Sequence, residues 1–427
     1  MQSIVEVYRT RTPGSAAMHR RASAVMPGGD TRAAVAHQPY PLTVVRAEGP
    51  YLWDVDGNQY LDLLGNYTSL VHGNAYPPIV AAAEEALRRG TQWAARNETA
   101  LALAEAITRR VASVDQVRFT NSGSEATLLA VEIARAATGR RKVLMARHGY
   151  HGSGAIFETG THGREGPDTL LAEYGDAAGF AAVLEEHGAD IACVIVEPVL
   201  GAGGVVAPPA GFHGSVAAAA HAAGALFILD EVITLRLGVG GAQAAEGVTP
   251  DLTTMAKIIG GGFPVGAVGG RSELMALTRP EGGAVPSSGT FNGNPVTAAA
   301  GVVSLAHLTE ARIATMAAQA ERLAEAIGVA ARGEGLACKV TRTGSLLNLY
   351  LADEVGFGPG RLDAAEIALL HLACLNHGVF LAPRGMMALS TVLQERHIDE
   401  AAVCIAAAIA DVAASLGAAR PVPVPVG

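Results

Sequence analysis

The sequence predicts an α/β protein whose large central sheet is mostly parallel, together with a smaller α+β region. Short apolar runs, such as Ile191–Val196, alternate with segments of helical periodicity. Strands that helices cover on both faces read as continuous apolar runs, so this alternation indicates a parallel sheet. The chain has 427 residues, of which 50% are hydrophobic, and this exceeds what one compact core usually holds.

The first part of the chain predicts a small antiparallel sheet followed by two helices. Strands are expected where β-branched and aromatic residues cluster, and Asp56-Gly57-Asn58 supplies the chemistry of a hairpin turn. Helices are expected where apolar residues recur every three to four positions. The expected elements are strands at 42–46, 51–55 and 60–63, and helices at 77–89 and 98–111.

The middle and last parts of the chain differ in pattern. The strands expected in the central sheet are 116–120, 142–145, 191–196 and 225–229. After Pro295, a long alanine-rich helical stretch leads to strand-like pieces at 346–351 and 379–381 and a helix at 400–416. Residues 421–425, where proline and valine alternate, should be extended. We therefore expect an N-terminal segment that joins the small domain, a large domain and a C-terminal small domain, at residues 1–65, 66–305 and 306–427.

The composition argues against several classes of partner. The net charge is -9, and the basic runs at 20–21 and 140–142 have no interleaved aromatic residues, so we expect no nucleic-acid partner. Charged residues interrupt the N-terminal segment, and no uninterrupted apolar run has the length of a membrane span. The four cysteines lack paired spacing, which indicates a reducing compartment. These features predict a cytoplasmic protein with no membrane partner.

Lys257 is the first candidate for chemistry. The chain contains only three lysines against 28 arginines, and Lys257 is surrounded by small and apolar residues. A poorly solvated ammonium has a lowered pKa, which leaves the free amine that imine chemistry requires. Arginine cannot supply such an amine. The alternative is a solvated lysine in a loop.

Two polar loops are candidates for binding a phosphate group. The strand at 116–120 runs directly into Ser122, Gly123 and Ser124 and then a helix. A helix N-terminus offers free N–H groups and the positive end of a dipole, and glycine allows close approach. The alternative is an ordinary helix cap formed by one of the serines. The loop before Pro295 offers Thr290 as a further hydroxyl group, although by itself it is only a loop.

Two other side chains follow strands at the same edge of the expected sheet. Asp230 ends a strand where doubly wound folds bind ligands, and its carboxylate could pair with a protonated ring nitrogen. Tyr150 could stack on an aromatic ligand. A turn or cap aspartate and a buried core tyrosine are the alternatives. Phosphate donors, a carboxylate, an aromatic ring and an amine together meet the requirements of pyridoxal 5'-phosphate (PLP).

Two other patterns in the sequence do not predict a binding site. The glycines at 238–241 do not open the helix that a dinucleotide site requires. His148 and His151 have a spacing compatible with metal binding, but their motif offers no carboxylate or cysteine partner, so no metal is assigned.

The order of the motifs resembles the class III, fold-type I aminotransferases across nearly the whole chain. The motifs that carry the resemblance are N-S-G-S-E-A at 121–126, G-Y-H-G at 149–152, E-P at 197–198, D-E-V at 230–232, T-T-x-x-K-x-I-G-G-G at 253–262 and G-T-F-N-G-N-P at 289–295. The resemblance implies that Lys257 forms the internal aldimine with PLP and then moves a proton between substrate and cofactor. It also implies a homodimer with its sites at the interface.

The resemblance assigns further cofactor contacts. Asp230 would pair with the pyridine nitrogen, with Tyr150 beside the ring and Val232 against its opposite face. Glu197 belongs to the same set of cofactor-binding residues. The phosphate group would contact Ser122, Gly123 and Ser124, assisted by Thr290 from the other subunit.

Within this class, the chain is most similar to the glutamate-1-semialdehyde aminomutases and the β-amino-acid (β-phenylalanine) aminotransferases. Three positions depart from the aminomutase pattern: Arg32, the segment 230–236 and the segment 382–386. Each resembles the β-amino-acid branch. There, an arginine matching Arg32 takes the substrate carboxylate, and one matching Arg384 lies in the other pocket and helps to accept the carboxylate of the keto acid. Surface arginines are the alternative.

The resemblance therefore implies transfer of an amino group from a β-amino acid or related amine to a 2-oxo acid such as 2-oxoglutarate or pyruvate. Aminomutase chemistry and transamination of amines without a carboxylate stay open. A cofactor-free Schiff-base lyase would also need Lys257, but it would need neither Asp230 nor two phosphate loops.

Overall fold

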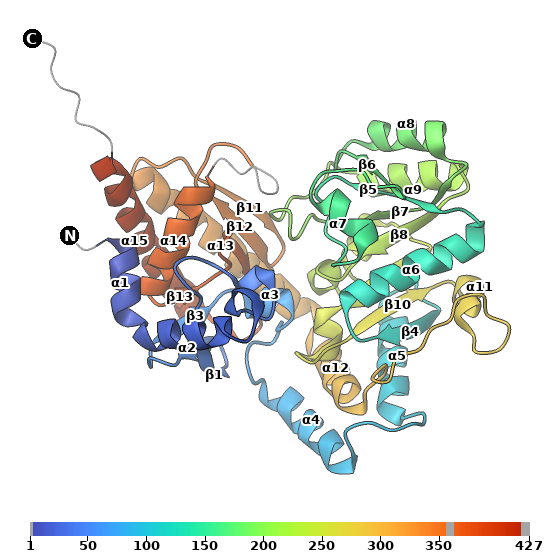
Figure 1. Cartoon of the computed structure of the whole chain (residues 1–427), viewed down its shortest axis with the longest axis horizontal. Coiled ribbons are helices and arrows are strands. Elements are labelled where there is room, and N and C mark those ends of the chain that lie inside the picture. The colour runs from blue at the N-terminus through green and yellow to red at the C-terminus, as the bar shows by residue number, and fades with distance from the viewer. Residues whose placement is uncertain (1–2, 356–362, 420–427) are drawn as a thin grey trace, which may run out of the picture.

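The computed structural model describes residues 3–355 and 363–419, and its largest element is a seven-stranded sheet (Figure 1). The strand order is β4-β10-β9-β8-β7-β5-β6. Strand β10 is antiparallel to both of its neighbours, and the remaining pairs are parallel, as the sequence predicts. The strands are β4 Gln116–Thr120, β5 Lys142–Ala146, β6 Thr169–Ala172, β7 Ile191–Val196, β8 Leu226–Asp230, β9 Leu252–Ala256 and β10 Gly266–Gly270.

Helices cover both faces of this sheet. Along β5, Val143 and Met145 pack in one apolar cluster with residues of α6, whereas Leu144 and Ala146 pack in another with residues of α8 and α9. This alternation follows from the two-residue period of a strand. The main helices are α4 Pro77–Arg89, α5 Glu98–Arg110, α6 Gly123–Thr138, α7 Ala155–Thr161, α8 Ala177–His187, α9 Phe212–Ala222 and α12 Pro295–His307.

Both ends of the described chain meet in a second lobe, where Figure 1 shows the blue N-terminal helices beside the orange and red C-terminal ones. Strands β1 Val44–Glu48, β2 Tyr51–Asp54 and β3 Gln59–Asp62 form a four-stranded sheet with β13 Val379–Phe380, which pairs in parallel with β3. A three-stranded sheet contains β11 Lys339–Thr343, β12 Leu346–Tyr350 and β14 Met386–Ala388. The helices are α1 Ile4–Arg11, α2 Pro13–Ser23, α13 Glu310–Gly333, α14 Ala364–Asn376 and α15 Glu395–Ala419.

Several elements were not expected from the sequence. Strands β6, β9, β10, β11 and β14 lie in segments where no strand was expected. Strand β10 contains Gly266, Gly269 and Gly270 and reads as a loop, yet a Cβ on Gly266 would lie 2.0 Å from the Ser122 carbonyl oxygen. Close approach of β10 to the turn before α6 therefore requires glycine there.

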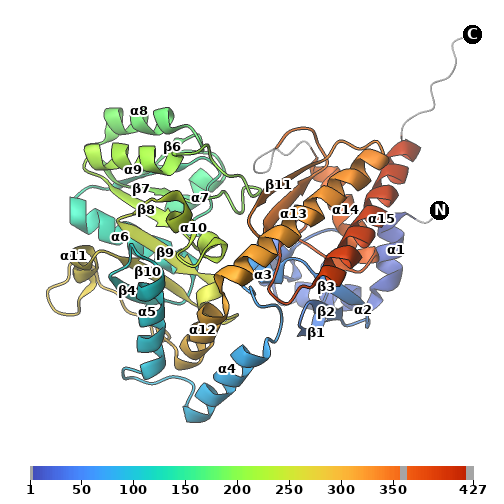
Figure 2. The ribbon, with the colours of Figure 1, turned by 180° about the vertical axis from the view of Figure 1, so that it is seen from behind.

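The helical stretch after Pro295 consists of two helices rather than one. Helix α12 ends at His307, and Thr309 caps α13 by accepting a hydrogen bond from the backbone N–H of Arg312. Figure 2 shows that α13 carries the chain from the region of the large sheet into the second lobe. The domain boundaries at 65 and 305 stay predictions, and the expected extended segment at 421–425 lies outside the described residues.

Helix α15 is the one described helix that is long and apolar enough to cross a membrane. Length and composition alone are weak grounds for a span, because a core helix passes the same test. Ala401, Ile405, Ala408 and Val412 recur at helical spacing and are buried in the core cluster with residues of α13 and α14. Its apolar side is therefore occupied within the protein.

Packing between α12 and the turn that begins at Lys257 gives a stability prediction. A Cβ on Gly301 would lie 2.0 Å from the Ile259 carbonyl oxygen. We expect Gly301→Ala to lower the free energy of unfolding by about 1–3 kcal/mol through overpacking, measured by urea denaturation. Gly214 lies in α9, and a Cβ added there would have no neighbour within 4 Å, so it is the matched control. Gly214→Ala should raise the same free energy by about 0.4–1 kcal/mol, and equal effects of the two substitutions would contradict this account.

Candidate active site

A cavity of about 560 Å³ lies at the carboxyl ends of β7, β8 and β9. Doubly wound sheets bind ligands at this edge, because the connections between strands and helices converge there. Nine of the residues singled out in the sequence line the cavity, namely Arg32, Ser122, Gly123, Ser124, Tyr150, Glu197, Asp230, Val232 and Lys257. Thr290 and Arg384 do not line it.

Lys257 enters the cavity from the end of β9. It is the first residue after the strand and has a φ of 52°, a left-handed conformation that costs energy for a residue with a side chain. Burial lowers the pKa of its amine to about 8, although the negative charges of Asp230 and Glu197 act in the opposite direction. The structure thus provides the poorly solvated amine that the sequence predicts.

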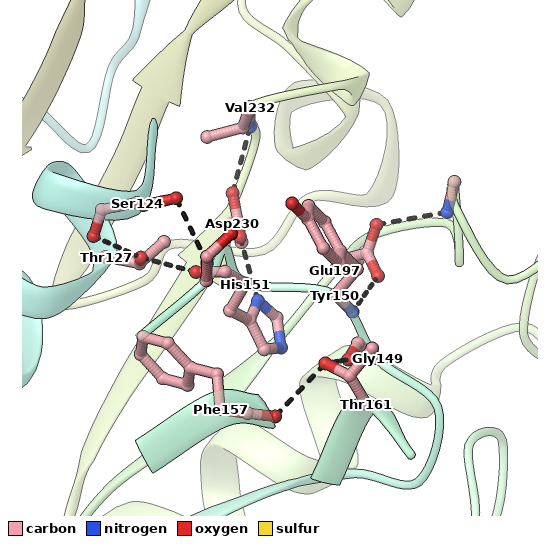
Figure 3. A network of polar contacts seen from close by, with 12 residues as sticks. Ser124, Thr127, Gly149, Tyr150, His151, Phe157, Thr161, Glu197, Asp230 and Val232 are labelled. Carbon is pink, nitrogen blue, oxygen red and sulfur yellow. Dashed lines mark hydrogen bonds and ion pairs between the residues drawn. The ribbon is translucent and has the colours of Figure 1, made fainter. Parts of the chain in front are cut away.

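Asp230 ends β8 and is buried (Figure 3). Its Oδ2 lies 2.8 Å from Nδ1 of His151, and its Oδ1 accepts a hydrogen bond of 3.0 Å from the backbone N–H of Val232. His151 is held in turn by the Thr127 hydroxyl, which donates to the His151 carbonyl oxygen at 2.6 Å. Both carboxylate oxygens therefore have partners that fix their orientation in the cavity wall.

Glu197 follows β7 and fixes the loop that carries Tyr150. Its Oε1 accepts a hydrogen bond of 2.9 Å from the backbone N–H of Tyr150, and its Oε2 accepts one of 3.0 Å from that of Gly201 (Figure 3). Burial raises the pKa of Glu197 to about 7, while neighbouring His151 lowers it and Asp230 raises it. Tyr150 remains 42% exposed, so the expected alternative of a buried core tyrosine is wrong.

The turn before α6 combines a helix cap with a lining of small residues. The Ser122 hydroxyl accepts a hydrogen bond of 3.2 Å from the backbone N–H of Glu125, so the capping role is present. The Ser124 hydroxyl accepts a hydrogen bond of 3.2 Å from the backbone N–H of Ser153. A Cβ on Gly123 would lie 3.2 Å from the methyl groups of Val232. Because Gly123 has no side chain, the turn stays open to the cavity. The role of this turn in phosphate binding stays a prediction.

The two arginines predicted to bind substrate lie near one aromatic ring. Arg32 lines the cavity, and its Nη2 donates a hydrogen bond of 2.6 Å to Oδ1 of Asn66. Arg384 lies in the connection between β13 and β14. The guanidinium carbons of Arg32 and Arg384 are 5.6 and 5.5 Å from the centroid of the Tyr67 ring. The structure therefore brings both arginines to one side chain.

Thr290 lies away from the cavity of its own chain. Its carbonyl oxygen accepts a hydrogen bond of 2.7 Å from the Gln92 side chain, and neighbouring Phe291 is 61% exposed. Within one chain, Thr290 is not assembled with the other predicted cofactor contacts. Its predicted role requires a second subunit.

Most of the chain matches the model of one protein family. Residues 32–409 match the model of the family described as Aminotransferase class-III. The chain is a class III aminotransferase. This confirms the family that the sequence motifs indicate, together with its enzyme class.

Relatives of this aminotransferase include two with different named activities. It is 37% identical over 410 residues to a β-phenylalanine transaminase from Variovorax paradoxus, covering 93% of this chain and 94% of the relative. It is 40% identical over 376 residues to a glutamate-1-semialdehyde 2,1-aminomutase from Rhodopirellula baltica, covering 83% and 84%. Among solved structures, an omega-transaminase from Sphaerobacter thermophilus has a TM-score of 0.90 at 35% identity, covering 95% and 99%. The predicted fold-type I architecture is therefore confirmed.

Class III aminotransferases depend on PLP, and the residues of this aminotransferase fit that cofactor. The cavity contains an amine with a lowered pKa, a buried carboxylate held by two donors and a glycine turn at a helix N-terminus. These groups suit an aldehyde, a ring nitrogen and a phosphate group, respectively.

Sequence reasoning missed the roles of His151 and Asn66. The sequence analysis weighed His151 only as a metal ligand and assigned it no role, whereas the structure pairs it with Asp230. Its position in G-Y-H-G, at the same sheet edge as Asp230, is the signal that could have found it. Within residues 3–355 and 363–419, no group of three or more histidine, cysteine, aspartate or glutamate residues could hold a metal ion. Asn66 has no sequence signal of this kind.

The pKa of Lys257 gives a prediction for the enzyme after PLP has been removed. The rate at which a small aldehyde labels Lys257 should rise with pH and level off above about 8, because only the deprotonated amine attacks a carbonyl group. Borohydride trapping followed by peptide mass spectrometry measures this rate. Lys142, which is paired with Asp190, and exposed Lys339 are internal controls in the same sample. A rate that levels off only above about 10, as for an ordinary lysine, would sink the prediction.

Proposed function

We propose that this aminotransferase moves an amino group from a β-amino acid, aromatic or aliphatic, or a related amine to a 2-oxo acid such as 2-oxoglutarate or pyruvate. One observation carries the proposal: Arg32, which lines the cavity that contains Lys257, and Arg384 both lie against the ring of Tyr67. Guanidinium groups bind planar carboxylates through paired hydrogen bonds. The similarity to a β-phenylalanine transaminase supports the same donor class.

Two side chains would carry the proton transfers. PLP, when bound, supplies an aldehyde and a ring that withdraws electrons. Lys257 would bond to the cofactor and then move a proton at the reacting carbon of the substrate, as its lowered pKa favours. Asp230 would hold a proton on the ring nitrogen, and the contacts of its carboxylate with His151 and Val232 keep it in place.

The other residues that line the cavity, together with Arg384, would bind and orient the cofactor and the substrates. Glu197 holds the backbone of Tyr150, so the tyrosine ring would lie beside the cofactor. Val232 would limit the opposite side, and its methyl groups already crowd the space beside Gly123. The turn at Ser122–Ser124 would hold the phosphate group through backbone N–H groups and hydroxyl groups. Arg32 would bind the donor carboxylate, and Arg384 would help to bind the carboxylate of the 2-oxo acid.

We propose that the protein is a homodimer whose active sites lie at the interface between the subunits. We also propose that it is located in the cytoplasm. Several large apolar side chains on α4, α5 and the loop before α12 are exposed, namely Leu87, Leu101 and Phe291. Helices α4 and α5 both pack against α12, and exposed apolar side chains around one region of a surface favour an interface. Thr290 lies beside Phe291 and outside the cavity of its own chain, which is compatible with a contribution to the partner's phosphate site.

Two alternatives keep the same cofactor chemistry. A glutamate-1-semialdehyde 2,1-aminomutase activity is favoured by the relative of that name at 40% identity. The other alternative is transamination of amines without a carboxylate, a donor class that the name of the similar omega-transaminase leaves open. All three candidates need Lys257 and Asp230, and they differ in what Arg32 and Arg384 bind.

The first test is a half-reaction with the PLP-loaded enzyme. Racemic β-phenylalanine should remove the visible absorption band, and 2-oxoglutarate or pyruvate should restore it. If only simple amines or glutamate-semialdehyde analogues remove the band, the corresponding alternative replaces the proposal.

We predict that Arg32→Ala lowers kcat/KM for β-phenylalanine by about tenfold to a hundredfold, because a charge-assisted contact with the carboxylate contributes about 1.5–3 kcal/mol. The matching amine without a carboxylate, 1-phenylethylamine, should be affected much less. Arg46→Ala is the matched control, since Arg46 is also exposed and also lies over an aromatic ring, Trp53. An unchanged preference for the carboxylated donor in Arg32→Ala would rule out this assignment.

The dimer proposal predicts complementation between two inactive variants. Lys257→Ala and Thr290→Glu should each be poorly active alone, because one lacks the amine and the other places a negative charge beside the phosphate group in the partner's site. Mixed dimers contain one site with both wild-type residues and should regain part of the activity. Light scattering measures the mass of the particle, and a monomer or a failure of mixing to restore activity would contradict the shared site.

A further inference from the structure

The segment that presents Tyr67 has an unusual backbone. From Gly65 to Thr68, all four residues have positive φ values, which are 54°, 48°, 53° and 75°. A left-handed turn of this kind costs roughly 1–2 kcal/mol for each residue that has a side chain. Such strain persists where the surrounding structure fixes it, and it commonly occurs at functional sites.

Several contacts hold the turn in this conformation. The backbone N–H of Leu70 donates to the Gly65 carbonyl oxygen at 2.9 Å, and that of Thr68 donates to the Leu64 carbonyl oxygen at 3.1 Å. Arg236 is fully buried, and its guanidinium donates to the Thr68 carbonyl oxygen at 3.4 Å. The turn therefore rests on the segment that follows Asp230 and can fix the positions of its side chains.

The turn places two side chains against Arg32. Asn66 accepts the 2.6 Å hydrogen bond from Nη2 of Arg32, and Tyr67 lies under the same guanidinium group. The Tyr67 hydroxyl donates to the Ala34 carbonyl oxygen. The rest of the ring packs against a buried apolar cluster that includes Met386, close in sequence to Arg384. The ring is thus held at both its ends.

Two positive charges close to one ring create an electrostatic problem. Like charges repel, and they do so more strongly where water is partly excluded. The face of an aromatic ring carries negative charge density and attracts each guanidinium group. Tyr67 can therefore keep Arg32 and Arg384 together in the absence of a substrate carboxylate.

We propose that Tyr67 is a positioning residue that sets the preference of the site for carboxylated substrates. It does so by holding the guanidinium groups of Arg32 and Arg384 at fixed positions beside its ring. This inference rests on the proposed function and deepens it. A β-amino acid presents one carboxylate and a dicarboxylic 2-oxo acid presents two. A pair of guanidinium groups fixed on one rigid ring accommodates both in turn, without a rearrangement between the two halves of the reaction.

The experiment compares three substitutions of Tyr67 in the PLP-loaded enzyme. Tyr67→Leu removes the ring, Tyr67→Phe retains it, and pentafluorophenylalanine at position 67 retains its shape but removes the negative charge density of its face. Steady-state kinetics with β-phenylalanine, 1-phenylethylamine and 2-oxoglutarate separate KM from kcat for substrates with and without carboxylates.

We expect Tyr67→Leu to raise KM for β-phenylalanine and for 2-oxoglutarate by about threefold to tenfold, the effect of losing cation–π contacts with exposed Arg32 and half-buried Arg384. Its effect on 1-phenylethylamine should be much smaller, so the ratio of the two donors changes. Tyr67→Phe should keep the ratio near that of the wild type. The pentafluorophenylalanine variant should behave as Tyr67→Leu does. If Tyr67→Leu does not fold, this variant alone tests whether the charge density of the ring sets the donor preference.

Two outcomes overturn the inference. The first is an equal loss for donors with and without a carboxylate, which would indicate a general disturbance of the cavity. The second is a pentafluorophenylalanine variant that matches Tyr67→Phe, which would show that the charge density of the ring is irrelevant. The result with Arg32→Ala separates this failure from that of the proposed function. If Arg32→Ala changes donor preference and the ring variants do not, the proposed function stands and only the role of Tyr67 is wrong.

Discussion

Two carboxylates and one amine share a cavity at the ends of three adjacent strands, and the rest of the site depends on how the charges of Glu197, Asp230 and Lys257 are stabilised. Burial lowers the pKa of Lys257 to about 8 and raises that of Glu197 to about 7. Asp230 instead keeps a direct contact with His151. Neighbouring groups acquire different protonation behaviour when their surroundings differ, and this difference allows acid and base roles to be divided within a small space.

The edge of the sheet that carries Glu197 and Asp230 was predictable, because these residues follow β7 and β8, which can be recognised locally. Lys257 follows β9, which was not expected, and it was singled out instead by its small and apolar sequence neighbours. Lys257 and Asp230 both lie directly at strand ends, where the fold class places ligand contacts. The pairing of His151 with Asp230 was missed because it joins two separate strand ends, and periodicity carries no information about such pairs. Strand β10 was missed for a related reason: the need for Gly266 comes from the Ser122 carbonyl oxygen, which is remote in sequence.

The placement of the arginines depends on a nonlocal feature of the fold. Parallel pairing of β3 with β13 brings the N-terminal strands to the connection that carries Arg384, and the core around them contains residues from both ends of the described chain. Composition and periodicity predict the elements but not this pairing. The resemblance to a family could suggest that both arginines matter, but it could not show that they share the Tyr67 ring.

The residues at the strand ends and the arginines come from different parts of the fold, and this separation affects how such an enzyme can acquire new substrates. Asp230 ends β8 and Lys257 directly follows β9 in the large sheet, whereas Arg32 and Arg384 lie in loops connected to the smaller sheets. Mutations in those loops can change substrate recognition while Asp230 and Lys257, to which we assign the proton transfers, keep their surroundings. Libraries for directed evolution would therefore retain more working variants if diversity were confined to the loops around Arg32 and Arg384, with the buried guanidinium of Arg236 left intact as the support of the turn between them.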